Sequence, residues 1–328
     1  MRVGPLLLLA LMLAVQPAAA HGPVPVQPAA VWGAWSFDPL VIVPLLLAHW
    51  AYGRGVRRLW ERAGRWRGIG GRHIAAFVLG EIAAIIALVS PVDQLGGTLL
   101  SAHMVQHGLL VAIAPPLLLL GLPGVAFAWA LPPGLRKGFT GSRSWRWLAA
   151  FANALSRPLP ASILHGLALW IWHAPAAFDA ALEYEWMHTL EHASFFGTAL
   201  LFWRGILGAR SAREIGPALG AAFFILMHSG LLAALITLAP RPLYDWYGAT
   251  ELWGMTAIED QQLAGLLMWV PMGLVYFGAC LLLAKRLLAP DFADGPAVIF
   301  ATDRFAASFP PARRLNRMLP STARFSAD

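Results

Sequence analysis

A succession of long apolar segments constrains the fold of this chain more than any other feature. Of its 328 residues, 58% are hydrophobic and only 12% are charged, which is far more apolar than a soluble domain of this length. A helix needs about 20 apolar residues to cross about 30 Å of hydrocarbon. Apolar segments near this length recur at Leu40–Gly53, His73–Ser90, Leu99–Leu122, Leu159–His173, Trp186–Ile206, Ile215–Leu238 and Leu263–Leu288. The sequence therefore predicts an all-α, polytopic membrane protein with a bundle of seven transmembrane helices.

The basic residues between these segments predict how the bundle is oriented. Lys and Arg collect in the cytoplasmic loops of membrane proteins. All but two of the 24 Lys and Arg residues follow the first, third, fifth or seventh apolar segment, and the exceptions are Arg2 and Arg241. We therefore expect the N-terminus outside the membrane and the C-terminus in the cytoplasm. The net charge of +7 then reflects topology and attraction to anionic membrane lipids, and it gives no reason to expect nucleic-acid binding.

The two ends of the chain differ from the membrane domain in composition. Residues 1–20 combine Arg2, an apolar run and a stretch of small residues, a pattern typical of a removable signal peptide. Their apolar run is too short to span the bilayer as a helix, which favours a removable signal peptide over the alternative of an uncleaved signal anchor. We expect an exported arm over residues 21–38, the membrane domain over 39–290, and a basic cytoplasmic tail over 291–328.

Two histidine pairs inside the apolar segments indicate a binding site. His103 and His107 are four residues apart, as are His188 and His192, so each pair shares one face of its helix. Ionisable side chains within a membrane are costly and are usually functional. At about 1.5 Å of rise per residue, both pairs lie within roughly 12 Å of the outer membrane surface. We therefore expect imidazoles from separate helices to converge on one metal ion or haem.

The same layer contains further candidate ligands. Imidazole suits zinc, copper, iron and nickel, whereas a thioether favours reduced copper, so Met104 beside the first histidine pair favours copper as the cofactor. Each of these residues also has a structural interpretation, as a hydrogen-bonded histidine, a gap-filling methionine, or an acidic residue that orients an imidazole or lies on an exposed rim. The predicted metal ligands are His103, His107, His173, His188, His192, Asp260 and Met104.

Three other patterns leave alternatives open. Glu81 lies within the second apolar segment, where it is protonated, paired with a group such as His49 or His228, or part of an ion path. Pro115 and Pro116 remove two backbone donors from the third segment and predict a kink. The phrase His188-Thr-Leu-Glu-His192 matches the H-x-x-E-H spacing of inverted zinc peptidases, but so short a match arises easily by chance.

Four motifs in order resemble the polytopic CtaG family of cytochrome c oxidase assembly factors. They are Ser101–His107 followed by Ala114-Pro-Pro, Trp172-His-Ala-Pro175, Glu185–His192, and Asp260-Gln-Gln followed by Met268-Trp-Val-Pro271. The resemblance covers about residues 35–288, and it is to the multispan family rather than to the single-span copper chaperone that shares the name. It implies a bacterial cytoplasmic-membrane protein that helps to supply copper to a haem-copper oxidase at the outer side, with an oxidase subunit as partner. The positions that match the family's motifs are His103, His107, His173, His188, His192 and Asp260.

Three functions fit these observations. The resemblance favours a copper-binding assembly factor without catalytic activity of its own. A seven-helix zinc hydrolase acting on lipids would use three imidazoles, Asp260 and a metal-bound water. A haem b carrier would instead place histidines from two helices on either side of the iron.

Overall fold

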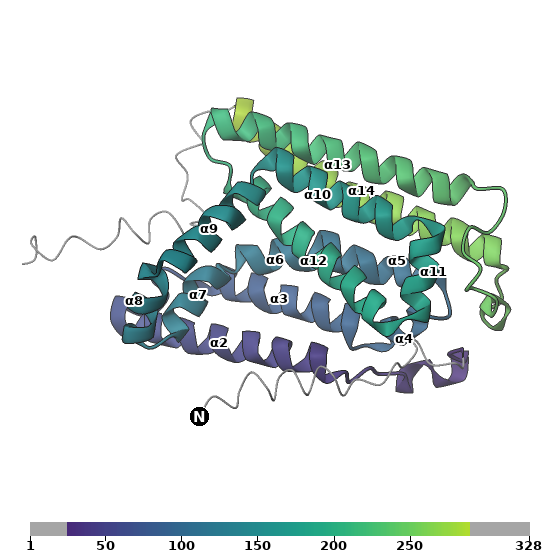
Figure 1. Ribbon diagram of the computed structural model, residues 1–328, viewed down its shortest axis with the longest axis horizontal. Helices are drawn as coiled ribbons and strands as arrows, with labels where there is room; N and C mark the ends of the chain where they lie inside the picture. Colours follow the sequence, from purple (N-terminus) through teal and green to yellow (C-terminus); the bar gives the residue numbers. More distant parts are fainter. Residues whose placement is uncertain (1–24, 289–328) are drawn as a thin grey trace, which may run out of the picture.

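The computed structural model describes residues 25–288, and all regular structure in this range is helical. The long helices are α2 (Pro39–Ala63), α3 (Gly71–Leu88), α10 (Pro158–His173), α12 (Glu185–Gly208), α13 (Ala212–Leu238) and α14 (Ala257–Leu288), together with a composite helix made of α5 (Leu100–Gly108), η2 (Leu109–Ile113) and α6 (Ala114–Leu120). These helices run side by side (Figure 1). The shorter ones are η1 (Pro28–Gly33), α4 (Pro91–Gly96), α7 (Pro123–Ala130), α8 (Pro133–Gly141), α9 (Arg143–Leu155), α11 (Pro175–Glu183) and η3 (Thr250–Trp253). The prediction of an all-helical fold is confirmed.

Five helical segments in the described range are long and apolar enough to cross a membrane. They are Pro39–Ala63, Gly71–Leu88, Leu100–Leu120, Ala212–Leu238 and Ala257–Leu288. The other two predicted spans correspond to α10, which has 16 residues, and to α12, which carries Glu185, Glu191 and Arg204. The chain is thus a helical membrane protein, while the count of seven spans and the orientation of the termini stay predictions. The predicted signal peptide and the whole predicted cytoplasmic tail lie outside the described residues.

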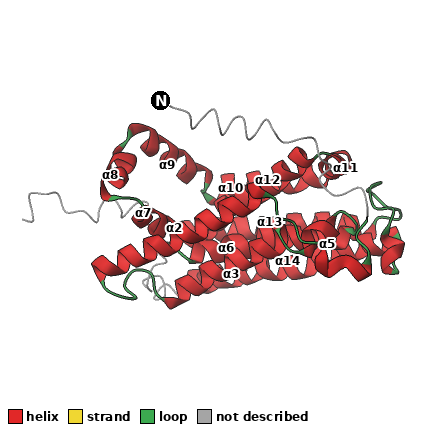
Figure 2. Ribbon diagram, turned by 90° about the horizontal axis from the view of Figure 1, so that it is seen from below, coloured by secondary structure: helices red, strands yellow, loops and turns green. Residues whose placement is uncertain are grey.

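The bundle has two chemically different ends. Figure 1 places α4, α11 and the loop between α13 and α14 at one end, and α7, α8 and α9 at the other. Figure 2 shows α8 and α9 standing away from the bundle at this second end. Here Arg54 and Arg58 of α2 both donate to the carbonyl oxygen of Ala130, at 3.2 and 2.9 Å. Both histidine pairs belong to the first end, because α5 and α12 begin there.

The composite helix is interrupted where the sequence predicted a kink. Pro115 has no N–H with which to bond the carbonyl of Val111, four residues earlier. The N–H of Ala114 reaches back five residues to the carbonyl of Leu109, so the chain forms one π-helical turn. The indole Nε1 of Trp203 on α12 donates to the carbonyl oxygen of Val111 at 2.8 Å. The carbonyl that lacks its usual donor within the helix therefore has a donor on a neighbouring helix. This hydrogen bond fixes α12 against the α5–α6 segment.

Helices α13 and α14 approach each other closely at a glycine near the histidine end. A Cβ at Gly265 would overlap the hydroxyl of Thr237 and would lie 2.8 Å from its backbone nitrogen. Any side chain at this position would push the two helices apart. Close packing of this kind is typical of membrane helices, whose interfaces favour small residues.

The buried carboxylate of Glu81 has a partner on the neighbouring helix. His49 Nδ1 of α2 lies 2.8 Å from Glu81 Oε2, at hydrogen-bond distance. The second partner that the sequence suggested, His228, instead accepts a hydrogen bond from Trp170 Nε1 at 3.0 Å. This hydrogen bond joins α2 to α3 within two of the predicted apolar segments.

Candidate metal centre

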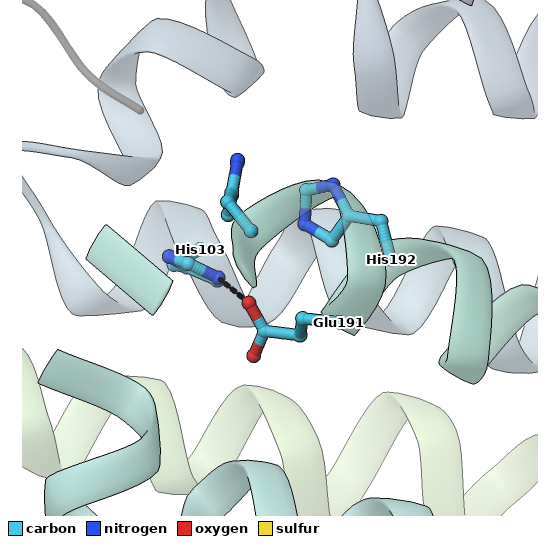
Figure 3. Close-up of side chains that lie close together, drawn as sticks. His103, Glu191 and His192 are labelled. Carbon is cyan, nitrogen blue, oxygen red and sulfur yellow. Dashed lines mark ion pairs between the residues drawn. The ribbon is translucent and has the colours of Figure 1, made fainter. Parts of the chain in front are cut away.

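Three imidazoles and one carboxylate meet between α5 and α12. His103, His188, Glu191 and His192 are all buried, and each offers one ligand atom within 4.8 Å of the others. Figure 3 shows the His103 ring directed at the carboxylate of Glu191, with His192 beside it. Ligand atoms that share one zinc or copper ion at about 2.1 Å lie no more than about 4.2 Å apart. Shifts on the order of 1 Å would therefore let all four groups bind one ion.

Glu191 lies at the centre of this cluster and is fully buried. Its Oε2 is 3.8 Å from His103 Nε2, and its Oε1 is 3.5 Å from His107 Nε2. Neither oxygen has a hydrogen-bond partner within residues 25–288. A buried carboxylate without a donor is unfavourable, and a cation held between the imidazoles would supply the missing interaction.

His107 and His173 extend the cluster beyond the four residues described above. Their ring centroids are 5.6 Å apart and the rings are nearly perpendicular. His173 Nδ1 lies 2.7 Å from the carbonyl oxygen of Leu169, which only accepts, so Nδ1 carries the proton and Nε2 keeps a lone pair. In the described part of the chain, His173 Nε2 and both ring nitrogens of His107 are buried without a hydrogen-bond partner. His173 Nε2 and one ring nitrogen of His107, the one without the proton, are thus suited to bind a metal.

Tyr247, in the loop between α13 and α14, orients the ring of His103. Its hydroxyl donates to the carbonyl oxygen of Gly96 at 3.0 Å and lies 3.2 Å from His103 Nδ1. Because the hydroxyl proton is used on Gly96, the phenol oxygen accepts from His103 Nδ1–H, and the lone pair of Nε2 faces Glu191. Burial, with the nearby carboxylate of Glu191 adding to the effect, raises the pKa of the Tyr247 phenol well above its usual value, so the group stays a neutral hydroxyl. No sequence pattern had singled out this residue.

Asp260 supports α5 rather than joining the four-residue group. Its Oδ2 accepts from the backbone N–H of Leu100 at 2.6 Å, and its Oδ1 accepts from the backbone N–H of Ser101 at 3.1 Å and from the Ser101 hydroxyl. These are the first N–H groups of α5, which have no partner inside the helix. The carboxylate thus caps the helix that carries His103 and His107. A role for Asp260 as a metal ligand stays a prediction.

Two other residues show how α5 is held. Gln106, between the two histidines of α5, donates through Nε2 to Asp93 Oδ1 at 2.7 Å and to the carbonyl of Ala87 at 2.9 Å. Burial raises the pKa of Asp93 to about 6, opposed by the hydrogen bond from Gln106. Met104 is buried in the apolar core of the bundle. Its role as a metal ligand stays a prediction.

Comparison with known proteins decides the family of the chain. Residues 50–289, which include every histidine of the cluster, match the family described as cytochrome c oxidase caa3 assembly factor. The chain belongs to this family. The relationship to CtaG assembly factors predicted from the sequence motifs is therefore confirmed.

Relatives of this chain include longer mycobacterial proteins. The chain is 28% identical over 255 residues to the "Uncharacterized protein Mb0105" of Mycobacterium bovis, a match that covers 75% of this chain and 38% of the relative. It is 27% identical over 243 residues to the "Uncharacterized protein ML1998" of Mycobacterium leprae, which covers 72% of this chain and 36% of the relative. The chain thus spans less than two fifths of the length of these curated relatives. No solved structure matches it.

Proposed function

We propose that this assembly factor binds copper in the histidine cluster and passes it to a cytochrome c oxidase subunit. The observation that carries the proposal is the convergence of His103, His188 and His192 with Glu191 at ligand distances. A set of nitrogen and oxygen donors binds Cu²⁺ more tightly than the other divalent first-row metals. An oxidase of the haem-copper type needs copper during assembly, so a protein of this family with such a cluster suits a carrier rather than a catalyst.

The proposed place of action is the outer side of a bacterial cytoplasmic membrane. The arginine-rich loops that follow α2 and precede α10 lie at the end of the bundle opposite to the histidine cluster (Figure 1). Under the positive-inside rule the arginine-rich end faces the cytoplasm, which puts the cluster near the exported surface. Seven spans, an external N-terminus and contacts with anionic lipids at the basic end belong to the same proposal.

The proposal is tested by the copper content of detergent-purified protein. We expect wild-type protein loaded with Cu²⁺ to retain the metal through desalting, and His188→Ala to lose at least one copper ion per chain. Cells carrying His188→Ala should also lose cytochrome c oxidase activity. His165→Ala is the matched control, because His165 is equally buried but bonds Thr198 and Tyr276 instead, and it should keep the copper.

Three outcomes would overturn the proposal that the cluster binds copper. Unchanged copper content in His188→Ala would show that the copper is not bound in the histidine cluster. Tightly bound zinc with turnover of an ester or amide lipid would favour the zinc hydrolase, while a Soret band in the purified protein would favour the haem carrier.

A second prediction concerns the hydroxyl that orients His103. Tyr247→Phe removes the hydroxyl that lies 3.2 Å from His103 Nδ1, and changes of this kind next to a metal ligand weaken binding by about 10- to 100-fold. Tyr244→Phe is the control: Tyr244 is also buried, but its hydroxyl donates to a backbone carbonyl, that of His173, at 3.0 Å. Copper titration should separate the two variants, and equal affinities would show that Tyr247 does not orient the ligand.

A further inference from the structure

We infer that the histidine cluster holds two metal ions, bridged by the carboxylate of Glu191. The inference rests on the proposed function, since it divides the same cluster into two positions. Its starting point is the number of donors. Five imidazoles and one carboxylate line the cluster, whereas a copper or zinc ion in a protein takes four or five ligands. One ion would therefore leave at least one buried donor unused.

The first position is formed by His103, His188 and His192 with Glu191. Their ligand atoms lie within 4.8 Å of one another, and the His103 Nε2 faces Glu191 Oε2 at 3.8 Å. The rings of His188 and His192 are 4.1 Å apart between centroids, as expected for neighbours one helical turn apart. This position takes one carboxylate oxygen and leaves the other available.

The second position is formed by His107 and His173 with the other oxygen of Glu191. His107 Nε2 lies 3.5 Å from Glu191 Oε1, and the His173 ring stands 5.6 Å from the His107 ring. His173 Nε2 and both nitrogens of His107 are buried without a hydrogen-bond partner within residues 25–288, and so are both oxygens of Glu191. A cation between these groups would satisfy them together.

The two histidines of α5 face different oxygens of one carboxylate, which is the arrangement of a bridging ligand. Their ring centroids are 4.3 Å apart. Paired metal ions in proteins are separated by about 3.5–4 Å, which agrees with two ions held along these adjacent rings. A shared carboxylate would let copper move between the positions without losing all of its protein ligands.

The inference is tested with Cu²⁺ and detergent-purified full-length protein. We expect two copper ions per chain by elemental analysis, and a weakened electron paramagnetic resonance signal because the bridged Cu²⁺ spins couple. His173→Gln and His107→Gln should each reduce the content to one ion and restore the signal of an isolated Cu²⁺. His165→Gln, outside the cluster, should keep two ions, and thermal unfolding of each variant establishes that it is folded.

The outcomes separate this inference from the proposed function. No copper in the wild-type protein overturns both. One copper that is lost in His188→Ala but kept in His107→Gln and His173→Gln leaves the proposed function standing and overturns the second position. One copper that is lost in all of these variants indicates a single shared site and also overturns it. If His107→Gln does not fold, His173→Gln decides alone: it removes Nε2, which lacks a hydrogen bond, and Nδ1, which bonds the backbone carbonyl of Leu169.

Discussion

Replacing Glu191 by glutamine is expected to stabilise the metal-free protein and to remove copper binding. The carboxylate is fully buried, and its oxygens lie 3.5 and 3.8 Å from imidazole nitrogens, beyond hydrogen-bond range. A glutamine keeps the shape, buries no charge, and offers an amide that can donate to an imidazole lone pair. An amide N–H that donates to an imidazole gives a partner to buried polar atoms that have none, which contributes about 1–3 kcal/mol to the free energy of unfolding. Loss of the anionic ligand should lower the copper affinity by more than about 100-fold. Even the loss of a residue that only hydrogen-bonds a metal ligand lowers metal affinity by about 10- to 100-fold.

Thermal unfolding of metal-free protein in detergent and a copper titration measure the two effects. Glu185→Gln is the matched control, because it removes a carboxylate from the first turn of the same helix, α12, and leaves the cluster intact. Substitutions at such positions change stability by about 0.5 kcal/mol or less. A Glu191→Gln protein that is less stable and still binds copper would show that this carboxylate does not bind the ion.

The sequence predicts the parts of this site that depend on local periodicity. A spacing of four residues places His103 above His107, and His188 above His192, on any α-helix. Counting residues from the membrane surface then places both pairs at one depth. The structure confirms that the pairs face each other, with ring centroids of His103 and His188 at 5.6 Å.

The role of Glu191 was harder to predict, although a signal was present. Three residues after His188, it shares a helix face with that histidine, and the H-x-x-E-H spacing drew attention to it. A single chain does not show which neighbouring helix that face meets. The contact with His103 and His107 depends on how α5 packs on α12, which is fixed in part by the bond between Trp203 and Val111.

Tyr247 and the partner of Glu81 depend on the tertiary structure alone. Tyr247 lies in a loop without periodicity, 144 residues from the histidine that it contacts. For Glu81 the sequence offered His49 or His228 as a partner, and only the packing of α2 on α3 selects His49. Long-range contacts of this kind leave no pattern in one sequence.

Replacing Asp260 by alanine should have the largest effect on stability. The carboxylate accepts hydrogen bonds from the backbone N–H groups of Leu100 and Ser101 and from the Ser101 hydroxyl. Both of these residues are buried. Without it, these donors lose their partner in an apolar interior. Loss of a helix cap costs about 1 kcal/mol and each unsatisfied buried donor about 1–3 kcal/mol. We expect a loss of about 3–5 kcal/mol in the free energy of unfolding, measured on metal-free protein.

The control for this change is its neighbour Glu259. Glu259 is exposed, and its carboxylate accepts from the backbone N–H and hydroxyl of Thr256 just before α14, so Glu259→Ala should cost about 1 kcal/mol. The comparison also decides between the two roles of Asp260. A cap stabilises the protein whether or not metal is present, whereas a ligand contributes only when the ion is bound. If Asp260→Ala leaves the metal-free protein as stable as Glu259→Ala does and abolishes copper binding, Asp260 is a ligand. If it destabilises the metal-free protein by several kcal/mol, copper affinity falls only because α5 no longer holds His103 and His107 in place.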